Sequence, residues 1–241
     1  MPVGGDYAKE FERLKALVNQ HRLLGREIVV VMGVGFVGAV MAAVIADTEN
    51  KKGNPTKFVI GMQRPSSRSY WKIPLLNRGI PPVKAEDPEV APMIHRCVNE
   101  KKTLIATFAY DALKLADVVV VDIQCDYQKE SLGNIREGQA DMAALEDSLE
   151  IIAEHISPKT LVLIETTVAP GTTEQVAYPI MRKVFRKRGI KSDPLLAHSF
   201  ERVMPGKQYV NSIRNFWRVC SGINEEATQR TAKFLEEIIN T

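Results

Sequence analysis

Short apolar runs recur along the chain and alternate with segments in which apolar residues repeat at helical spacing. We predict strands at residues 27–32, 58–61, 104–106, 117–123, 161–164, 195–198 and 216–220. We predict helices at residues 39–46, 70–79, 88–100, 139–156 and 224–239. The polar segment 126–138 contains glycine and is predicted to be a loop at the carboxyl end of a strand. Because strands and helices alternate, the pattern predicts an α/β fold with a doubly wound, mostly parallel sheet.

A glycine-rich turn follows the first predicted strand directly. Residues 27–32 lead into Gly33-Val34-Gly35-Phe36-Val37-Gly38, and an alanine-rich helix follows. This order of strand, G-x-G-x-x-G and helix is the dinucleotide-binding fingerprint in its required context. Gly33 would make the tight turn, Gly35 would leave room for a pyrophosphate, and Gly38 would let helix and strand pack closely. We therefore predict a cofactor site made by Gly33, Gly35, Phe36, Val37 and Gly38.

The fingerprint makes the fold a Rossmann-type sheet, and a further helix is predicted ahead of it. Its apolar positions repeat at helical spacing and are Tyr7, Phe11, Leu14 and Val18. We therefore expect residues 1–24 to form an extra N-terminal helical extension. Residues 25–241 are expected to form the dinucleotide-binding domain.

The residues after the second predicted strand bear on the choice of cofactor. An NAD site usually has an acidic residue there that binds the adenosine ribose, but this chain has Gln63. An amide can still form a hydrogen bond with a hydroxyl group. Arg64 and Arg68, with two neighbouring serines, could instead bind a 2′-phosphate. NAD and NADP therefore both stay open on the residues alone, and Arg64 is the residue predicted to set the choice.

A second turn of the same kind lies in residues 165–174, after the apolar run 161–164. It is rich in threonine, contains Pro170-Gly171, and precedes a helical pattern with Val176, Ile180 and Val184 on one face. Ligands bind at such strand-to-helix turns in open α/β sheets, and Gly171 would let a ligand approach the backbone. An ordinary capped turn would also explain this segment.

Composition excludes several classes of function. The 241 residues are 45% hydrophobic and 25% charged, and a net charge of +3 is too small to indicate nucleic-acid binding. The basic run at residues 183–188 lies at a predicted helix end, where cations are favoured. The three cysteines have no metal-binding spacing and suggest a reduced, cytoplasmic protein. The charged residues near the start are not the pattern of a signal peptide, so we expect none, and no apolar run is long enough to span a membrane.

Three segments together resemble the UDP-glucose/GDP-mannose (nucleotide-sugar) 6-dehydrogenase family. They are the glycine turn 33–38, the segment 165–172, which resembles E-[ST]-T-V-x-P-G-T, and the segment 198–206. The last is similar to S-P-E-R-V-x-P-G, with Phe200 in place of the usual proline. This version resembles the UDP-N-acetylhexosamine branch more than the UDP-glucose branch. The resemblance covers about residues 25–240.

The resemblance implies an enzyme that oxidises the C6 alcohol of a UDP-sugar to a uronic acid with two molecules of NAD. It implies that Glu201 is a catalytic carboxylate that positions water or moves protons, and that Thr167 contacts the nicotinamide half of the cofactor. His198 and Arg202 would face the substrate. Each of these has a plain alternative, because Glu201 and Arg202 could be an exposed loop pair and His198 a structural histidine. Gln124 and Cys125 would line the cofactor, with Cys125 not the nucleophile.

The sequence departs from this family at its end. The family's catalytic lysine, asparagine and cysteine lie in later domains, one of which forms a homodimer and one of which holds the UDP. This chain ends before both, so we expect part of a longer enzyme that binds cofactor without full catalysis. Two alternatives stay open: a non-catalytic dinucleotide-binding module, and another Rossmann dehydrogenase of the hydroxy-acid or 6-phosphogluconate type.

Overall fold

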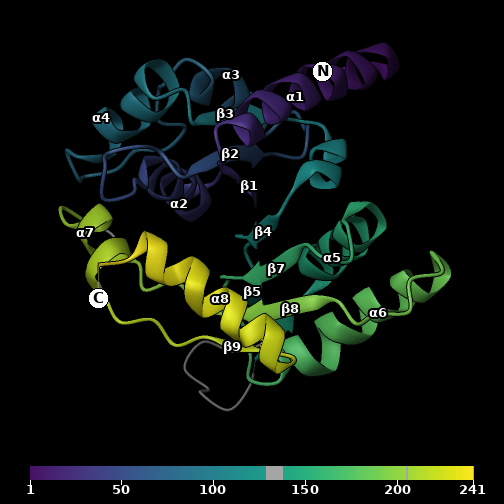
Figure 1. The fold of residues 1–241 in the computed structure, drawn as a ribbon. Coiled ribbons are helices and arrows are strands. Elements are labelled where there is room, and N and C mark those ends of the chain that lie inside the picture. Colours follow the sequence, from purple (N-terminus) through teal and green to yellow (C-terminus); the bar gives the residue numbers. More distant parts are fainter. Residues whose placement is uncertain (129–137, 205, 241) are drawn as a thin grey trace.

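The computed structural model describes residues 1–128, 138–204 and 206–240, and its main feature is a seven-stranded sheet (Figure 1). The strands are β1 (Glu27–Met32), β2 (Lys57–Met62), β3 (Leu104–Thr107), β4 (Val118–Val121), β7 (Leu161–Ile164), β8 (Leu195–His198) and β9 (Ser221–Gly222). Their order is β3-β2-β1-β4-β7-β8-β9, and all neighbours pair in parallel except β8 and β9. This is the Rossmann strand order with one antiparallel edge strand, as predicted.

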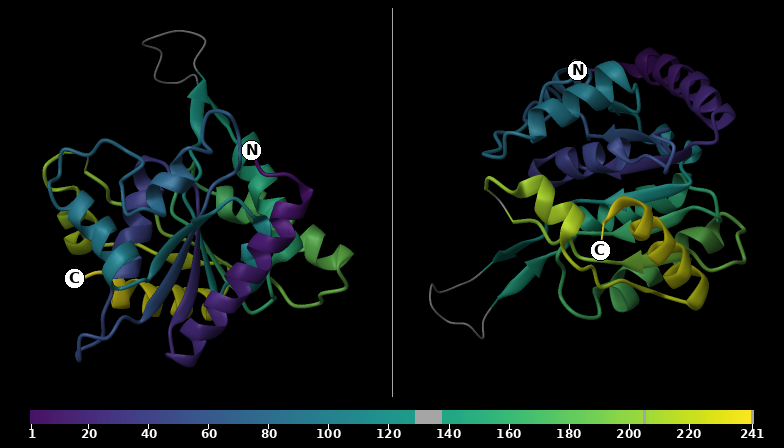
Figure 2. Two further views of the ribbon diagram at one scale, coloured as in Figure 1. Left: turned by 90° about the horizontal axis from the view of Figure 1, so that it is seen from above. Right: turned by 60° about the vertical axis from the view of Figure 1, so that its left-hand side comes forward.

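Helices cover both faces of the sheet, which explains why the strands are almost entirely apolar (Figure 2). One face packs against α2 (Phe36–Asp47), α3 (Lys72–Leu76), α4 (Val90–His95), α7 (Tyr209–Asn215) and α8 (Glu225–Ile238). The other packs against α1 (Gly4–Leu23), α5 (Ala143–His155), α6 (Tyr178–Lys187) and the 3₁₀ helix η2 (Tyr110–Leu115). Single π-helical turns, η1 (Arg96–Glu100) and η3 (Thr173–Ala177), continue α4 and precede α6. Alternate strand residues enter the two cores, as a doubly wound sheet requires.

The parallel strands end together at one edge of the sheet. Met32 at the end of β1 pairs with Met62 on one side and with Val121 on the other. The residues that leave these strands, and the ones that leave β7 and β8, are therefore brought to the same edge. They are Gly33, Gln63, Asp122, Glu165 and Ser199.

The predicted N-terminal helix α1 is present and packs on the sheet. Leu14 and Val18 are buried in the core of that face. The ring of His21 stacks on Phe58 of β2, with 3.7 Å between ring centroids. Near the other end of the helix, Thr107 donates a 2.7 Å hydrogen bond to Glu10. Helix α1 therefore contacts the sheet along most of its length.

The far end of α2 is held by a cluster of charges. Asp47, the last residue of α2, accepts hydrogen bonds from Arg96 and Lys101 after α4 and from Arg214 of α7. The Asp47 carboxylate is nearly buried, and these three cations hold its pKa well below its ordinary value despite burial. Two segments that are far apart in sequence, η1 with its C-cap Lys101 and α7, are thus fixed to the carboxyl end of one helix.

The structure corrects the prediction for residues 126–138. Residues Asp126–Gln128 form β5, which pairs antiparallel with β6 (Gln139–Asp141), and residues 129–137 lie outside the described residues. Helix α5 accordingly begins at Ala143 and not at residue 139. The predicted apolar stripe of α5 is otherwise buried as expected, with Leu145 and Leu149 in the core.

The strand predicted at residues 216–220 was wrong. These residues belong to no helix or strand, and β9 consists only of Ser221–Gly222. Trp217 and Val219 are 78% and 68% exposed, because the alternation turns Arg218 inward in their place. Helix α7, just before this segment, was not predicted, because its short sequence has no clear helical stripe or capping residue.

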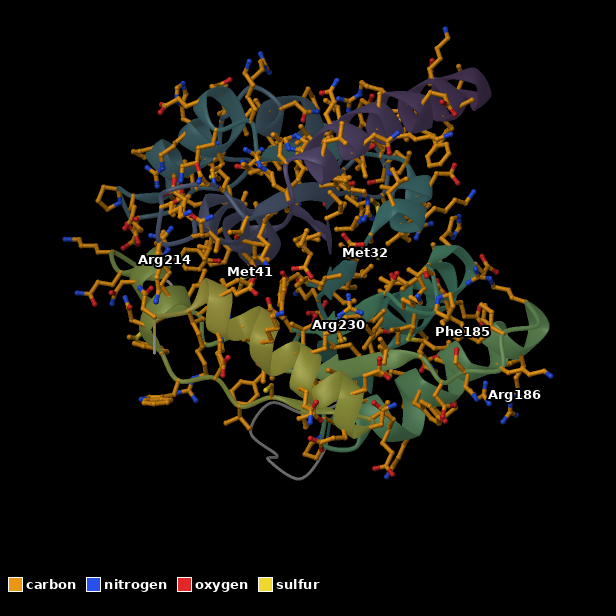
Figure 3. The ribbon with its side chains drawn as sticks, viewed as in Figure 1. Met32, Met41, Phe185, Arg186, Arg214 and Arg230 are labelled. Carbon is orange, nitrogen blue, oxygen red and sulfur yellow. The ribbon has the colours of Figure 1, made fainter. Side chains whose placement is uncertain are left out.

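The face of α6 is displaced by one position from the predicted one. Val184 is buried as expected, but Met181 and Phe185 fill the core where Val176 and Ile180 were expected. The π-helical turn η3 precedes α6 and adds a residue to the turn, which shifts the buried face. Arg186, next to the buried Phe185, points outward (Figure 3). Arg188, at the end of the basic run, instead donates hydrogen bonds to the carbonyl oxygens of Ala153 and Ile156. No helix within the described residues is long and apolar enough to cross a bilayer.

The stacked His21 gives a testable pH dependence of stability. Burial and the adjacent Arg26 lower the pKa of His21 from 6.5 to about 4. Between these values the unfolded chain binds a proton that the folded chain does not, so the free energy of unfolding should fall as pH falls through this window. We expect the free energy of unfolding to fall by an amount on the order of 2 kcal/mol between about pH 7 and pH 4.5. The His21→Gln variant should not show this loss. Urea unfolding of both proteins at the two pH values measures it, and equal losses would contradict it.

Candidate cofactor site

The glycine turn is packed so closely that two of its three glycines admit no side chain. A Cβ atom on Gly38 would lie 1.8 Å from the carbonyl oxygen of Gly33. A Cβ on Gly33, which has φ of +96°, would lie 2.6 Å from the carbonyl oxygen of Asp122. Gly35 differs, because a Cβ there would meet nothing within 4 Å. Gly33 and Gly38 are therefore needed for packing, whereas Gly35 borders open space.

The amino end of α2 faces that space. Gly35 is the N-cap residue and, having no side chain, makes no side-chain capping hydrogen bond. The first turn of α2 contains no acidic residue, and most of the helix is buried and apolar. Its first N–H groups and its dipole thus remain available to a ligand, which is the arrangement that binds phosphate at helix N-termini.

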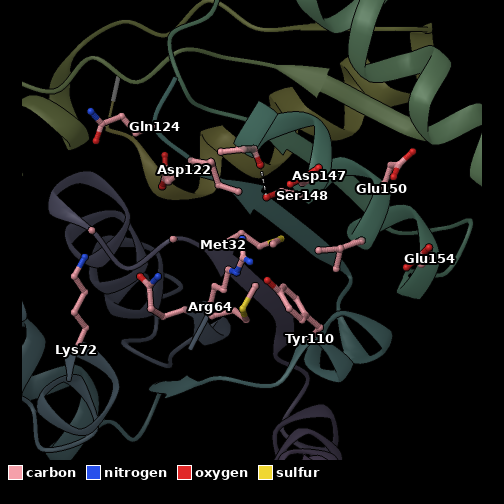
Figure 4. A pocket seen from close by; sticks show the side chains of 17 residues that line it. Met32, Arg64, Lys72, Tyr110, Asp122, Gln124, Asp147, Ser148, Glu150 and Glu154 are labelled. Atoms are coloured by element: carbon pink, nitrogen blue, oxygen red, sulfur yellow. Dashed lines mark hydrogen bonds between the residues drawn. The ribbon is translucent and has the colours of Figure 1, made fainter. Parts of the chain in front are cut away.

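A cavity of about 590 Å³ lies on the β2 side of the glycine turn (Figure 4). Gly33 and Gly35 form one end of it, and Gln63, Arg64 and Tyr110 line it further along. The side-chain oxygen of Gln63 accepts a 3.2 Å hydrogen bond from the Val34 N–H, so the amide NH₂ group remains as a donor.

The opposite wall of this cavity is acidic. Asp147, Glu150 and Glu154 all come from α5, across from Tyr110 and Arg64 (Figure 4). No salt bridge joins Arg64 to these carboxylates among the described residues. An additional phosphate in this cavity would face these three negative side chains as well as the cations of Arg64 and Lys72.

A second cavity, of about 370 Å³, lies on the β7 side of the same turn. It is lined by Gly35, Phe36, Val37, Gly38, Asp122, Ile123, Gln124, Cys125, Thr166, Thr167 and Glu201. Both cavities include Gly35, Asp122 and Gln124, so they meet at the glycine turn. An extended ligand with a phosphate at Gly35 would therefore reach into both.

Thr167 and Glu201 come together in the second cavity, although 34 positions separate them. The Thr167 hydroxyl donates a 3.3 Å hydrogen bond to the Glu201 carboxylate. The Glu201 N–H donates a 3.0 Å hydrogen bond to the carbonyl oxygen of Glu165. The threonine-rich turn after β7 thus holds the segment that carries Glu201.

Behind this cavity lies a buried charged cluster that the sequence analysis missed. Arg218 donates to the Glu165 carboxylate at 3.2 Å and to the Phe200 carbonyl oxygen at 3.3 Å, with both charged side chains 2% exposed. One oxygen each of Asp122 and Glu165 is enclosed without a hydrogen-bond partner among the described residues. The sequence signal for this cluster was an acidic residue directly after each of two buried strands, Asp122 and Glu165. Arg218 gave no such signal, because it lay inside a segment predicted to be a strand.

A sequence model of the UDP-glucose/GDP-mannose dehydrogenase family, NAD binding domain, matches residues 27–240. The chain belongs to this family. The cofactor of the site is accordingly NAD, and what the family resemblance implied is confirmed.

Among solved structures, NDP-N-acetyl-D-galactosaminuronic acid dehydrogenase from Methanosarcina mazei is similar, with 30% sequence identity and a TM-score of 0.77. The match covers 94% of this chain and 45% of the Methanosarcina chain. UDP-N-acetyl-D-mannosamine dehydrogenase of Pyrococcus horikoshii is 32% identical over 99 residues, or 41% of this chain and 23% of the relative. The same enzyme of Methanococcus maripaludis strain S2 is 22% identical over 209 residues, 87% of this chain and 42% of the relative. The match covers less than half of each of these relatives.

The cysteines of this family member are poorly suited to nucleophilic attack. Burial and the neighbouring Asp126 and Asp141 raise the pKa of Cys125, which lines the second cavity, so its thiol stays protonated at neutral pH. Cys97 is buried, and burial raises its pKa to about 12. Burial also raises the pKa of Cys220. The prediction that Cys125 lines the cofactor without attacking the substrate is consistent with this environment.

Two predicted substrate residues of the dehydrogenase domain line neither cavity. The His198 ring lies 3.3 Å from the carbonyl oxygen of Thr166, and Arg202 is exposed, with its guanidinium 5.7 Å from the centre of the Phe200 ring. Their contact with a substrate stays a prediction.

The three glycines give a prediction that separates folding from binding. Gly35→Ala should leave the free energy of unfolding within about 1 kcal/mol, because its φ of −82° suits any residue and space is open. It should weaken NAD binding by roughly tenfold or more, because the methyl group takes the space of a phosphate. Gly38→Ala should instead destabilise the fold by about 1–3 kcal/mol through backbone contact. Chemical unfolding and calorimetric NAD titration measure both, and unchanged NAD affinity in Gly35→Ala would contradict this assignment.

Proposed function

We propose that this chain forms the cofactor half of the active site in a UDP-N-acetylhexosamine 6-dehydrogenase, which oxidises the sugar C6 alcohol to a carboxylate with two NAD. The observation that carries the proposal is the second cavity, where the glycine turn, Thr167 and Glu201 meet. These three parts belong to the three segments that resemble the family. The names of the Methanosarcina and Pyrococcus relatives, both N-acetylated-sugar dehydrogenases, support this branch. We propose that it acts in the cytoplasm.

The proposed cofactor position follows from the two cavities. The pyrophosphate lies at Gly35 and the amino end of α2, the adenosine half enters the cavity with Gln63 and Arg64, and the nicotinamide half enters the cavity with Thr167. When bound there, NAD supplies the hydride acceptor. The free NH₂ group of Gln63 donates a hydrogen bond to the adenosine ribose in place of the usual acidic acceptor.

Glu201 is the proposed catalytic carboxylate. The Thr167 hydroxyl and the Glu165 carbonyl oxygen fix its side chain and its backbone, respectively, at the cavity. A carboxylate held there can accept a proton from the substrate alcohol or orient water for the second oxidation. His198 and Arg202 flank it and are proposed to contact the substrate.

A complete reaction also needs the family's nucleophilic cysteine, which none of the three cysteines here provides. We therefore propose that this chain alone binds NAD but does not turn over UDP-sugars. The remaining active-site residues, the UDP site and the homodimer contacts would come from polypeptide that matches the other half of the relatives.

Replacing Arg64 tests what selects the cofactor. Arg64 is the cation of the adenosine cavity closest in sequence to Gln63, so Arg64→Gln should weaken NADP(H) binding by roughly 10-fold and leave NAD(H) within about twofold. Arg68→Gln is the matched control, because Arg68 is exposed and lines neither cavity. Calorimetric titrations at one salt concentration provide the affinities. An unchanged ratio of NAD to NADP affinity in Arg64→Gln would refute the role of Arg64.

A chimaera tests the proposed reaction. Residues 1–240 of this chain, joined to the remaining part of the Methanosarcina relative, should reduce NAD in the presence of a UDP-N-acetylhexosamine. Glu201→Gln in the chimaera should lower kcat by roughly 10²–10⁴-fold with little loss of NAD affinity. Glu174→Gln, an exposed carboxylate outside both cavities, is the control. A chimaera that folds and binds NAD but is inactive, or turnover by the isolated chain, would count against the proposal.

A further inference from the structure

The cavity proposed for the nicotinamide half is acidic. Asp122 and Glu201 line it, and the other described residues that line it carry no charge. The nicotinamide ring carries a positive charge in NAD⁺ and none in NADH. Glu201 lies in this cavity, and Asp122 lies where it meets the adenosine cavity, so the two redox forms of the cofactor differ by one unit of charge near both carboxyl groups.

Asp122 is enclosed on several sides. It follows β4, and a Cβ atom on Gly38 of α2 would lie 3.1 Å from its own Cβ. Its Oδ2 atom is buried and has no hydrogen-bond partner among the described residues. A carboxylate oxygen in that situation is strongly disfavoured in the ionised form.

The groups that face Asp122 are mostly acidic. Glu165 follows β7 and Glu201 follows β8, while Arg218, before β9, is the cation that acts on Asp122. Arg218 already donates to Glu165. From α7, the hydroxyl of Tyr209 donates to the carbonyl oxygen of Phe36, and the pKa of Tyr209 is raised by burial and by nearby Asp122 and Glu201. Cys125, three residues after Asp122 in the sequence, is a neutral thiol because its pKa is raised.

The guanidinium of Arg218 thus acts on both Asp122 and Glu165, and Glu201 adds a third carboxyl group nearby. Burial raises the pKa of Asp122 well above its ordinary value, and Glu165 and Glu201 raise it further against the opposing effect of Arg218. Burial also raises the pKa of Glu165, but its direct contact with Arg218 favours its ionised form. Of these groups, Asp122 is therefore the one whose surroundings most favour the protonated form.

We propose that this cavity distinguishes oxidised from reduced cofactor by charge, and that binding of NAD⁺, but not of NADH, expels a proton from Asp122 to solvent. The inference rests on the proposed placement of the nicotinamide half. The Asp122 carboxylic acid loses one proton and becomes a carboxylate beside the cationic ring, and no electron moves in this step.

The expected pH dependence has a definite sign. At low pH, NAD⁺ must displace the proton, so part of its binding free energy is used for ionisation. As pH rises towards and past the pKa of Asp122, the affinity for NAD⁺ should increase by at most about tenfold per pH unit and then level off. The affinity for NADH has no such gain. The ratio of NAD⁺ to NADH affinity should therefore rise with pH.

The test is calorimetric titration of the whole chain with NAD⁺, NADH and ADP-ribose, in buffers that differ in ionisation enthalpy. The dependence of the observed heat on the buffer gives the number of protons released. We expect release of part of a proton, up to one, with NAD⁺ and none with ADP-ribose, which has the adenosine and pyrophosphate but no nicotinamide. Equal proton numbers for NAD⁺ and NADH, with an affinity ratio that does not change with pH, would overturn the inference.

The ADP-ribose titration separates this failure from failure of the cofactor site itself. If ADP-ribose and NADH bind but NAD⁺ releases no proton, the proposed cofactor site is supported and the charge-based selection by Asp122 is wrong. If none of the three ligands binds, the cofactor site and the charge-based selection are both wrong.

Asp122→Asn supplies the matched variant. The amide is nearly the same size and cannot ionise, so proton release should vanish and NAD⁺ affinity at about pH 8 should fall by roughly 10- to 100-fold. NADH affinity should change by less than about threefold. Glu154→Gln removes a carboxylate from the adenosine cavity and should leave the proton release with NAD⁺ unchanged. Loss of proton release in Glu154→Gln, or its persistence in Asp122→Asn, would contradict the assignment to Asp122.

Discussion

The cofactor site depends on how closely α2 approaches the ends of β1 and β4. No Cβ atom fits on Gly33 or Gly38, because each would contact a backbone carbonyl oxygen. This contact brings the amino end of α2 down to the sheet edge, with Asp122 directly beneath the turn. The turn then separates two cavities that share the same wall, and it determines where a pyrophosphate can lie.

Most of the fold could be predicted because the parallel strands are buried on both faces and appear as uninterrupted apolar runs. The errors arose where that condition fails. At residues 216–220, Trp217 and Val219 alternate with Arg218 as in a strand with an apolar buried face. In the structure the directions are reversed, because Arg218 points inward to Glu165 and the two apolar side chains are exposed. Helix α7 is short and anchored by tertiary contacts, such as that between Tyr209 and Phe36, which sequence periodicity cannot reveal.

The site was predictable where chemistry follows from local sequence. The glycine turn and Thr167 belong to motifs whose spacing carries the information. The acidic wall of α5 and the cluster of Asp122, Glu165 and Arg218 depend instead on which chain segments meet at the sheet edge. Gln63 shows the limit most clearly. It was expected to bind ribose, and its hydrogen bond to Val34 shows that one half of its amide is already occupied by the glycine turn.

Helix α2 has a different partner at each end. Its carboxyl end is fixed by Asp47, which three cations from two distant segments hold in place. No side chain among the described residues caps its amino end. A helix anchored in this way has its amino end fixed in orientation before any ligand binds. The conformational entropy cost of orienting the backbone N–H groups at this end is thus incurred during folding. When a phosphate binds, the main remaining entropy cost is the lost motion of the phosphate itself.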